Sequence, residues 1–291
     1  MKIAIVLRHD LLKSSFAAHA EELSRRDHNV RWFVSDTEWK QLKEKILLFE
    51  PDVIWTWNGR FAWYENLFYE LSRNFRVVVS EMAWLPQKGN HFICGFEDSF
   101  HRCDWRISPS YPIAEGVLED LKNGYQVVDP TFSKDYMVIP FQLENDTSIT
   151  RLSPVYKTNL QTVYRAKATF PDLELIISKH PRQKDIPYDG PGIEYFGSCT
   201  TLDLAVNAKW LVAINSTVTI ETLLWHGNVM VFGYNPARQV LLDGFSCEMK
   251  PHTQEERYRV LSYLFNRQYK PEIPDAKVLA FIEGDLQVYE Q

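Results

Sequence analysis

The sequence predicts an α/β fold in which two Rossmann-like domains face a central cleft. In both halves of the chain, apolar segments typical of buried strands alternate with segments of helical spacing, the pattern of parallel α/β sheets. The length of 291 residues suits two domains of about 100 to 200 residues each. We therefore expect an N-terminal domain over 1–145 and a C-terminal domain over 146–291, with the last helix packing back on the N-terminal domain.

The first half shows a strand and helix rhythm with clear breaks. Turn-forming residues at 27–29 end the first helix, and Pro51 ends the second. Strands are predicted at 1–7, 30–34, 52–57, 76–80, 105–108 and 136–141, and helices at 11–26, 37–49, 61–72 and 113–121. Residues 81–100 lack clear periodicity, and we expect a long functional loop there. The strand at 136–141 is expected to close the first domain, with a linker near 143–155.

The second half restarts the rhythm after that linker. Strands are predicted at 173–177, 193–196, 210–214 and 229–232, and helices at 155–169, 201–207, 218–225, 254–265 and 276–288. Residues 182–192 are rich in Pro, Gly and charge and are expected to form a loop.

The most informative stretch is the strand-helix-strand unit over 210–232. Asn215, Ser216 and Thr217 are expected to form the turn and the N-cap of the helix, and Gly227 its end. A helix that starts at the carboxyl end of a strand directs backbone N–H groups toward an anion such as phosphate. Glu221 shares a helix face with Thr217 and could reach a ribose or sugar hydroxyl. The alternative is an ordinary capped helix.

Composition, charge and the absence of known motifs argue against several classes of protein. The net charge of −6 provides no global basic field for nucleic acid or anionic membranes. Four cysteines without CxxC spacing suit a reduced, cytoplasmic protein, and no apolar run is long enough to span a membrane, so any membrane contact is expected to be peripheral. The motifs GxGxxG, GxxxxGK[ST], GxSxG and HExxH are absent, which argues against a dehydrogenase, a P-loop kinase, that class of serine hydrolase and a zincin.

Candidate site residues follow the predicted strands, because ligands of open α/β sheets bind beyond the carboxyl ends of the strands. These residues are Arg8, His9 and Asp10 after the first strand, Asn58, Gly59 and Arg60 after the third, Glu81 after the fourth, Gln142 after 136–141, and Lys179 and His180 after 173–177.

These residue types suit the transfer of a group from a phosphate. Lys179 could neutralise a diphosphate, and His180, placed before Pro181 where the strand must stop, could protonate a leaving phosphate. An ordinary, partly exposed histidine is the alternative. A carboxylate must deprotonate an acceptor hydroxyl, and Asp146, Glu81 and Asp10 are the candidates. No DxD pair follows a strand, so we expect no metal and no cofactor beyond a nucleotide-sugar co-substrate.

Five short motifs occur in one order over about residues 55–235. They are Trp57-Asn58-Gly59-Arg60, Glu81 with Trp84-Leu85-Pro86-Gln87, Gln142 spaced four from Asp146, Lys179-His180-Pro181, and Asn215-Ser216-Thr217 with Glu221. In these motifs the chain resembles the capsular-polysaccharide biosynthesis proteins that include Kdo-type glycosyltransferases.

The resemblance implies a GT-B fold whose C-terminal domain holds a nucleotide-sugar donor. It implies that His180 and the Asn215-Ser216-Thr217 turn contact the donor phosphates, that Glu221 holds a ribose or sugar hydroxyl, and that Gln142 and Asp146 serve the reaction centre. The N-terminal domain would bind the acceptor, with Arg8, His9, Asn58, Gly59, Arg60 and Trp84 as the candidate residues. The activity expected is metal-independent transfer of a hexosyl or Kdo group to a surface or capsular glycan.

Three other functions suit the same features. A phage-type glycosyltransferase acting on a hydroxymethylated base in DNA would need a basic rim, for which the candidates are Arg8, Lys13, Arg60, Lys88, His91 and Arg102. A non-catalytic carbohydrate-binding or export component would keep the fold without chemistry, and a sugar-nucleotide epimerase would share the two-domain shape.

Overall fold

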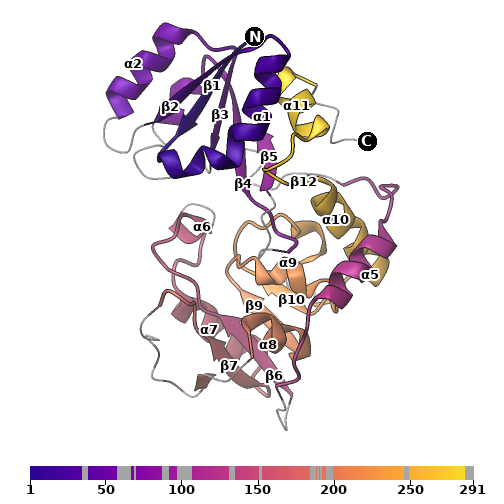
Figure 1. The fold of residues 1–291 in the computed structure, drawn as a ribbon. Helices are drawn as coiled ribbons and strands as arrows, with labels where there is room; N and C mark the ends of the chain where they lie inside the picture. Colours follow the sequence, from indigo (N-terminus) through magenta and orange to yellow (C-terminus); the bar gives the residue numbers. More distant parts are fainter. Residues whose placement is uncertain are drawn as a thin grey trace. The chain divides into compact units, whose positions relative to one another are not determined.

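The computed structural model describes residues 1–34, 39–57, 67–68, 70–86, 92–96, 107–130, 135–150, 153–183, 188, 190, 192–194, 199–245 and 249–285. The candidate residues Asn58, Gly59, Arg60, Lys88, His91 and Arg102 lie outside these ranges, as does much of the helix expected at 61–72. The chain forms two compact units, one of 1–100 with 266–291 and the other of 101–265 (Figure 1).

The first unit contains a six-stranded sheet in the order β12-β5-β4-β3-β1-β2. Its parallel strands are β1 (Lys2–Leu7), β2 (Asn29–Val34), β3 (Val53–Trp57) and β4 (Arg76–Met82). Two strands that the sequence analysis missed extend this sheet in antiparallel pairing, β5 (Phe92–Phe96) and β12 (Gln268–Tyr269). The expectation of a loop throughout 81–100 was therefore wrong, because β5 is defined by pairing with β4 rather than by a local periodicity.

Both faces of this sheet are covered. Side chains alternate along a strand, so Ile3 and Ile5 of β1 face one layer while Ala4 and Val6 face the other. The first layer contains α1 (Ser14–Arg25), preceded by the 3₁₀ turn Asp10–Leu12, and α11 (Ala276–Glu283). The second contains α2 (Trp39–Phe49) and buried residues of the segment 67–71.

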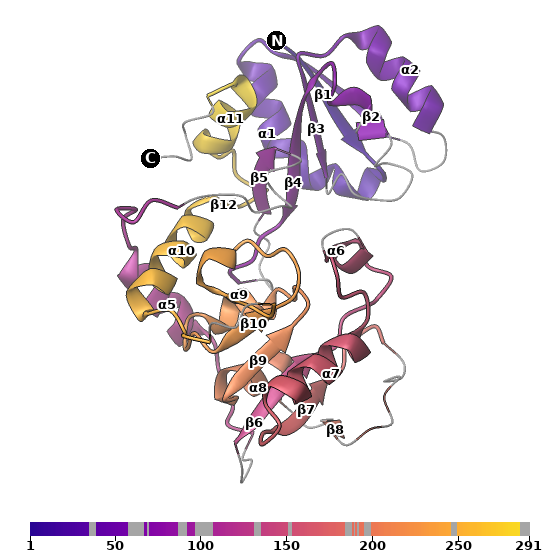
Figure 2. The ribbon, with the colours of Figure 1, turned by 180° about the vertical axis from the view of Figure 1, so that it is seen from behind.

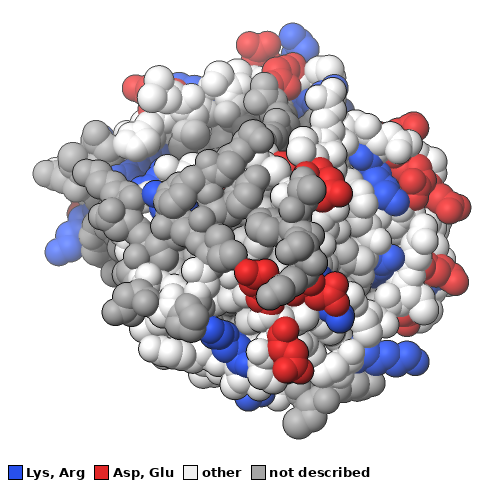
Figure 3. All heavy atoms as spheres, turned by 90° about the horizontal axis from the view of Figure 1, so that it is seen from below, with Lys and Arg blue, Asp and Glu red and all other residues white. Residues whose placement is uncertain are grey.

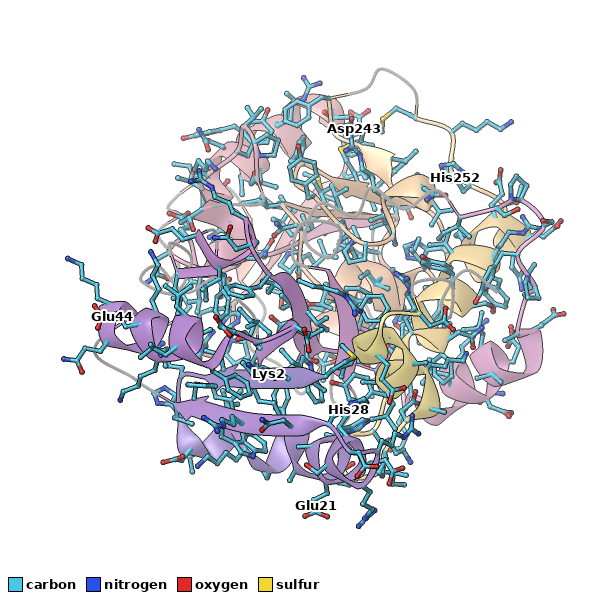
Figure 4. The ribbon with its side chains drawn as sticks, turned by 90° about the horizontal axis from the view of Figure 1, so that it is seen from above. Lys2, Glu21, His28, Glu44, Asp243 and His252 are labelled. Atoms are coloured by element: carbon cyan, nitrogen blue, oxygen red, sulfur yellow. The ribbon has the colours of Figure 1, made fainter. Side chains whose placement is uncertain are left out.

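The last helix was expected to return to the N-terminal domain, and α11 packs its buried face into this core beside α1 (Figure 1). The Arg76 guanidinium of β4 donates to the carbonyls of Phe281 and Ile282 at the end of α11. There the Glu283 carboxylate lies 3.0 Å from Nε2 of His28, labelled in Figure 4. Polar bonds therefore reinforce the apolar docking of α11 at its C-terminal end.

The second unit contains another six-stranded sheet, in the order β11-β10-β9-β6-β7-β8, with all pairs parallel. Its strands are β6 (Tyr136–Pro140), β7 (Glu174–Ser178), β8 (Ile193–Glu194), β9 (Trp210–Ala213), β10 (Val229–Val231) and β11 (Leu242–Asp243). Its helices are α5 (Glu115–Gly124), α6 (Thr147–Thr150), α7 (Asn159–Thr169), α8 (Thr201–Asn207), α9 (Val218–Thr222) and α10 (Gln254–Asn266), with a 3₁₀ turn at Arg238–Val240.

Helices cover opposite faces of this sheet as well (Figure 2). Val163 and Ala166 of α7 pack with Met137 and Ile139 of β6. The neighbouring β6 residue Tyr136 points to the other face, where its hydroxyl donates to the Leu204 carbonyl of α8 at 2.9 Å.

Three further expectations were wrong. The strand 136–141 does not close the first sheet; β6 is a central strand of the second, because an apolar strand fits either sheet and only its pairing with β7 and β9 decides. Residues 107–108 are not in a strand. The helix expected at 218–225 ends at Thr222, as described below.

Candidate functional site

Four adjacent strands of the second sheet end in polar or aromatic residues at the same edge. In spatial order the strands are β10, β9, β6 and β7, and the residues that follow them are Tyr234, Asn215, Gln142, and Lys179 with His180. Because all four strands are parallel, their carboxyl ends meet at one edge of the sheet, where ligands of open α/β sheets bind. Gln142, which the sequence analysis placed in the N-terminal domain, therefore lies at the same edge of the second sheet as Lys179, His180 and Asn215.

Gln142 and Asn215 form a pair of hydrogen bonds between the ends of β6 and β9. Gln142 Nε2 donates to Asn215 Oδ1 at 3.0 Å, and the Asn215 backbone N–H donates to Gln142 Oε1 at 3.1 Å. Both side chains are half-buried. An amide nitrogen carries two protons, so Gln142 Nε2 keeps one donor beyond its bond to Asn215.

The two carboxylates of the 142–146 loop have different surroundings. Glu144 Oε1 accepts from the Asn159 backbone N–H at 2.7 Å and from Asn159 Nδ2 at 3.2 Å, so Glu144 fastens the loop to the start of α7. The Asp146 carboxylate instead lies close enough to His180 to raise the pKa of that imidazole. The structure thus places these two predicted catalytic residues, from different loops, within electrostatic range of each other.

His180 is held in one tautomer. The Arg182 backbone N–H donates to His180 Nδ1 at 3.1 Å, which leaves the proton of the neutral ring on Nε2. Burial lowers the pKa of His180, and the nearby Arg182 charge lowers it further, whereas Asp146 raises it. The net shift is downward, so near pH 7 the ring is neutral and offers Nε2–H as a hydrogen-bond donor.

The turn over 215–217 leads into a helix shorter than expected. Thr217 occupies the N-cap position of α9, but its side chain makes no capping bond, and α9 has five residues. Helix α9 itself is held from the loop after β10, where Asn235, 1% exposed, donates to Thr219 Oγ1 at 2.9 Å. The Thr219 hydroxyl in turn donates to the Ser216 carbonyl of the turn. A Cβ on Gly233 would lie 3.2 Å from Asn215 Nδ2, so glycine permits the close approach of these two loops.

Glu221 is largely enclosed. It is 7% exposed, and its Oε1 accepts from the Tyr125 hydroxyl at 2.7 Å. Burial, followed by the Glu221 charge, raises the pKa of Tyr125, so this hydroxyl keeps its proton as a donor. The contact of Glu221 with a ribose or sugar stays a prediction.

Side chains of helix α10 donate hydrogen bonds to the backbone carbonyls that follow α9. Arg257 Nη1 donates to the Leu223 carbonyl at 3.1 Å, and the Tyr258 hydroxyl donates to the Leu224 carbonyl at 3.3 Å. Arg257 is 6% exposed and also bonds the Thr253 carbonyl. Past Thr222 the backbone continues in tight i→i−3 turns, in which the Leu224 N–H bonds the Glu221 carbonyl and the Trp225 N–H bonds the Thr222 carbonyl. The bonds from α10 satisfy the Leu223 and Leu224 carbonyls at the end of these turns.

Replacing Arg257 by Met is therefore expected to lower the free energy of unfolding by about 1–3 kcal/mol, because buried carbonyls lose their donors. Urea denaturation measures this loss. The matched control is Arg259→Met in the same helix, since Arg259 pairs with the exposed Glu255 carboxylate at 2.6 Å and such pairs contribute about 0.3–0.5 kcal/mol. Equal losses in the two variants would contradict this role of Arg257.

The remaining predicted residues lie in the first unit. His9 and Asp10 are exposed, Arg8 and Glu81 are half-buried, and Asp10 pairs with the Lys13 ammonium at 2.7 Å. The Glu81 carboxylate accepts from the Met82 backbone N–H at 2.9 Å. Trp84, expected at the acceptor site, is 9% exposed, so most of its ring belongs to the core.

Sequence reasoning missed several residues that shape the second-unit edge. Asn159 bonds Gln142 and Tyr125 bonds Glu221, so each fixes a predicted site residue from another element. Asn235 bonds Thr219 of α9, and the Arg238 guanidinium lies over the Tyr234 ring at 5.7 Å. Only Asn159 carries a local signal, because it follows Thr158 in a capping box with Gln161. Within the described residues, no three His, Cys, Asp or Glu side chains gather as metal ligands would.

Two α/β units with mainly parallel sheets and a polar strand edge define a GT-B fold. Solved structures agree. The Thermosulfurimonas dismutans KpsC β-Kdo 2,7 transferase matches with a TM-score of 0.63 and 16% identity, over 88% of this chain and 89% of that chain. The β-Kdo 2,4 transferase of the same KpsC gives a TM-score of 0.58 and 12% identity, with 89% of each chain covered. The predicted structural resemblance to Kdo transferases is confirmed, and at these identities it establishes the fold.

Sequence comparisons add one relative. Protein FixF of Sinorhizobium fredii is 27% identical over 209 residues, which are 66% of this chain and 51% of FixF. The chain therefore spans about half the length of the curated relative it matches. No protein-family model matches the chain. Among the helices in the described ranges, none has the length and apolar character needed to cross a bilayer.

Proposed function

We propose that this protein is a glycosyltransferase that moves a sugar from a nucleotide-sugar donor to a hydroxyl acceptor. The observation that carries the proposal is the gathering of Gln142, Asp146, His180 and Asn215 at one edge of the second sheet. The fold shared with two Kdo transferases supports the same class.

The chemistry assigns a role to each group. Transfer breaks the bond between the anomeric carbon and the donor phosphate oxygen, and forms a bond from that carbon to the acceptor oxygen. His180 Nε2–H, the Lys179 ammonium and the second Gln142 amide proton are suited to the charge that develops on the leaving phosphate. Asp146 accepts the proton that the acceptor hydroxyl loses. Asn215, Ser216 and Thr217 would contact the phosphates and Glu221 a donor hydroxyl.

The acceptor assigned here is a surface or capsular glycan, and the transferred group a hexose or Kdo. The described Lys and Arg residues on the face in Figure 3 lie among Asp and Glu residues, and neither sign covers that face. The net charge of −6 gives the chain no overall basic field of the kind that attracts DNA, so we assign a glycan rather than a DNA acceptor. The cations and amide donors at the strand edge give the phosphates partners within the protein, so we infer that the reaction needs no metal.

Nucleotide binding is the first expected result. One of UDP, CMP and GDP, at 100 times its dissociation constant, is expected to add about 2.7 kcal/mol of stability and raise Tm by about 5–10 °C, with EDTA present. Thermal-shift measurements test this, and the matching nucleosides without phosphate serve as controls. The absence of a shift with all three nucleotides would contradict the donor site.

Product analysis separates the rival functions. The nucleotide-sugar that binds is expected to be hydrolysed slowly without acceptor, and free nucleotide with free sugar would accumulate. Binding without hydrolysis would favour the non-catalytic carbohydrate-binding component. Conversion of the donor to an isomeric nucleotide-sugar would favour an epimerase.

A further inference from the structure

Asn159 clamps the backbone of Gln142 from both sides. Its Oδ1 accepts the Gln142 backbone N–H at 2.9 Å, and its Nδ2 donates to the Gln142 carbonyl at 2.8 Å. The side chain is 2% exposed. A single amide thus copies the pair of bonds that a neighbouring strand would make, at the point where β6 ends and the loop begins.

The same residue holds the next part of the loop. Glu144 Oε1 accepts from both the backbone N–H and Nδ2 of Asn159, so positions 142 and 144 are both fixed to the start of α7. Leu143, between them, accepts from the Asp146 backbone N–H at 2.8 Å and so closes the turn that carries Asp146. The place of Asp146 therefore depends on bonds that converge on Asn159.

Capping of α7 does not require this side chain. Thr158 Oγ1 accepts from the Gln161 backbone N–H at 3.2 Å, and Gln161 Oε1 accepts from the Thr158 N–H at 3.1 Å. This capping box satisfies the Thr158 and Gln161 N–H groups without any bond from the Asn159 side chain. The Asn159 amide is directed away from the helix, to the loop.

We propose that Asn159 is a positioning residue that fixes Gln142 and Asp146 in the geometry needed for sugar transfer. Its side-chain hydrogen bonds go to the Gln142 backbone and to Glu144, so its effect on the Gln142 side chain and on Asp146 passes through the loop. The proposal rests on the proposed function for its activity readout, whereas the geometry of the loop can be tested without activity.

The experiment compares Asn159→Ala with Val163→Ala. Val163 is fully buried one turn further along α7, so its truncation removes core packing without touching the loop. Asn159→Asp is the second variant; it keeps the size of the side chain and an acceptor for the Gln142 N–H, but it replaces the donor with an oxygen that repels the Gln142 carbonyl and Glu144. Each variant is studied well below its Tm.

The first readout is the pKa of His180, followed by NMR titration of its ring protons. Asp146 raises this pKa while burial and Arg182 lower it. A displaced loop removes the contribution of Asp146, so Asn159→Ala, which adds no charge, is expected to lower the pKa of His180, in the direction that Asp146→Asn also gives. Val163→Ala is expected to leave it unchanged.

The second readout is kcat, which is expected to fall about 10–100-fold in the Asn159 variants, as small misplacements of reacting groups do. Combining Asn159→Asp with Glu144→Gln restores a donor between the two side chains, and is expected to recover part of kcat. An unchanged His180 pKa, with a kcat no lower than in Val163→Ala, would overturn the proposal. A wild-type protein without transfer activity would instead refute the proposed function, and the titration would still decide the role of Asn159.

Discussion

Replacing Asp146 by Asn is expected to lower the rate of sugar transfer by about 10²–10⁴-fold, the usual contribution of a general base. Among the three carboxylates predicted for this role, Asp146 is the one that lies in the same unit as the residues proposed to bind the donor, and close enough to His180 to alter its pKa. The amide cannot accept the proton of the acceptor hydroxyl. Steady-state kinetics with the identified donor and acceptor measure the loss, and binding of the nucleotide is expected to persist.

Glu144→Gln is the matched control, because Glu144 lies two residues away in the same loop. The Gln side chain keeps an oxygen that can accept from Asn159, so the loop is expected to stay in place and kcat to change less than about threefold, or about 0.7 kcal/mol. Full activity in Asp146→Asn would return the role of the base to Glu81 or Asp10. A larger loss in Glu144→Gln than in Asp146→Asn would reverse the two assignments.

Acidification is expected to destabilise the first unit by about 3 kcal/mol between pH 6.5 and 4, through His19. Its ring is fully buried against Trp55 and Tyr269, and its Nε2 accepts the Asp275 backbone N–H at 3.0 Å. Burial lowers the pKa of His19 from 6.5 to about 4, more than the charge of Asp275 and the carbonyl of Pro271 raise it.

The direction of the effect follows from which state binds the proton. Below pH 6.5 the unfolded chain protonates His19 while the native ring stays neutral, so stability is complete above that pH and falls until the native ring titrates near 4. His19→Gln keeps an acceptor for Asp275 and removes the titration, so urea denaturation at several pH values should show a flatter profile. The pKa values of His180 and His226 are also lowered, so the stability of His19→Gln is expected to keep a smaller dependence on pH. An unchanged profile in His19→Gln would contradict this account.

Local sequence signals predicted most of the fold. The apolar runs predicted at 1–7 and 210–214 correspond to the buried strands Lys2–Leu7 and Trp210–Ala213, and α8 has the predicted bounds of 201–207. These local signals failed where the neighbouring strands decide whether a segment forms a strand or which sheet it joins. Residues 92–96 form a strand because β4 offers an edge, and 136–140 join the second sheet because β7 and β9 flank them.

The sequence predicted that polar residues follow the parallel strands of the second sheet, and Lys179, His180 and Asn215 lie at one edge of that sheet, whereas Gln142 had been placed in the N-terminal domain. The differing surroundings of Glu144 and Asp146 were not, because they depend on Asn159, fifteen residues further along the chain from Glu144. The sequence pattern also did not predict how exposed the candidate side chains are. Trp84 and Glu221 have residue types suited to ligand contact, yet both side chains are mostly enclosed by the protein.

The return of α11 to the first unit has a consequence for synthesis. The second unit is one continuous segment, 101–265, and all of it leaves the ribosome before the helix that completes the first core. Until residues 266–283 emerge, the α1 face of the first sheet lacks the apolar cover of Val278, Leu279, Phe281 and Ile282. The order of translation therefore gives the second unit the earlier opportunity to reach its native state, whereas the first unit can complete its core only after α11 has emerged.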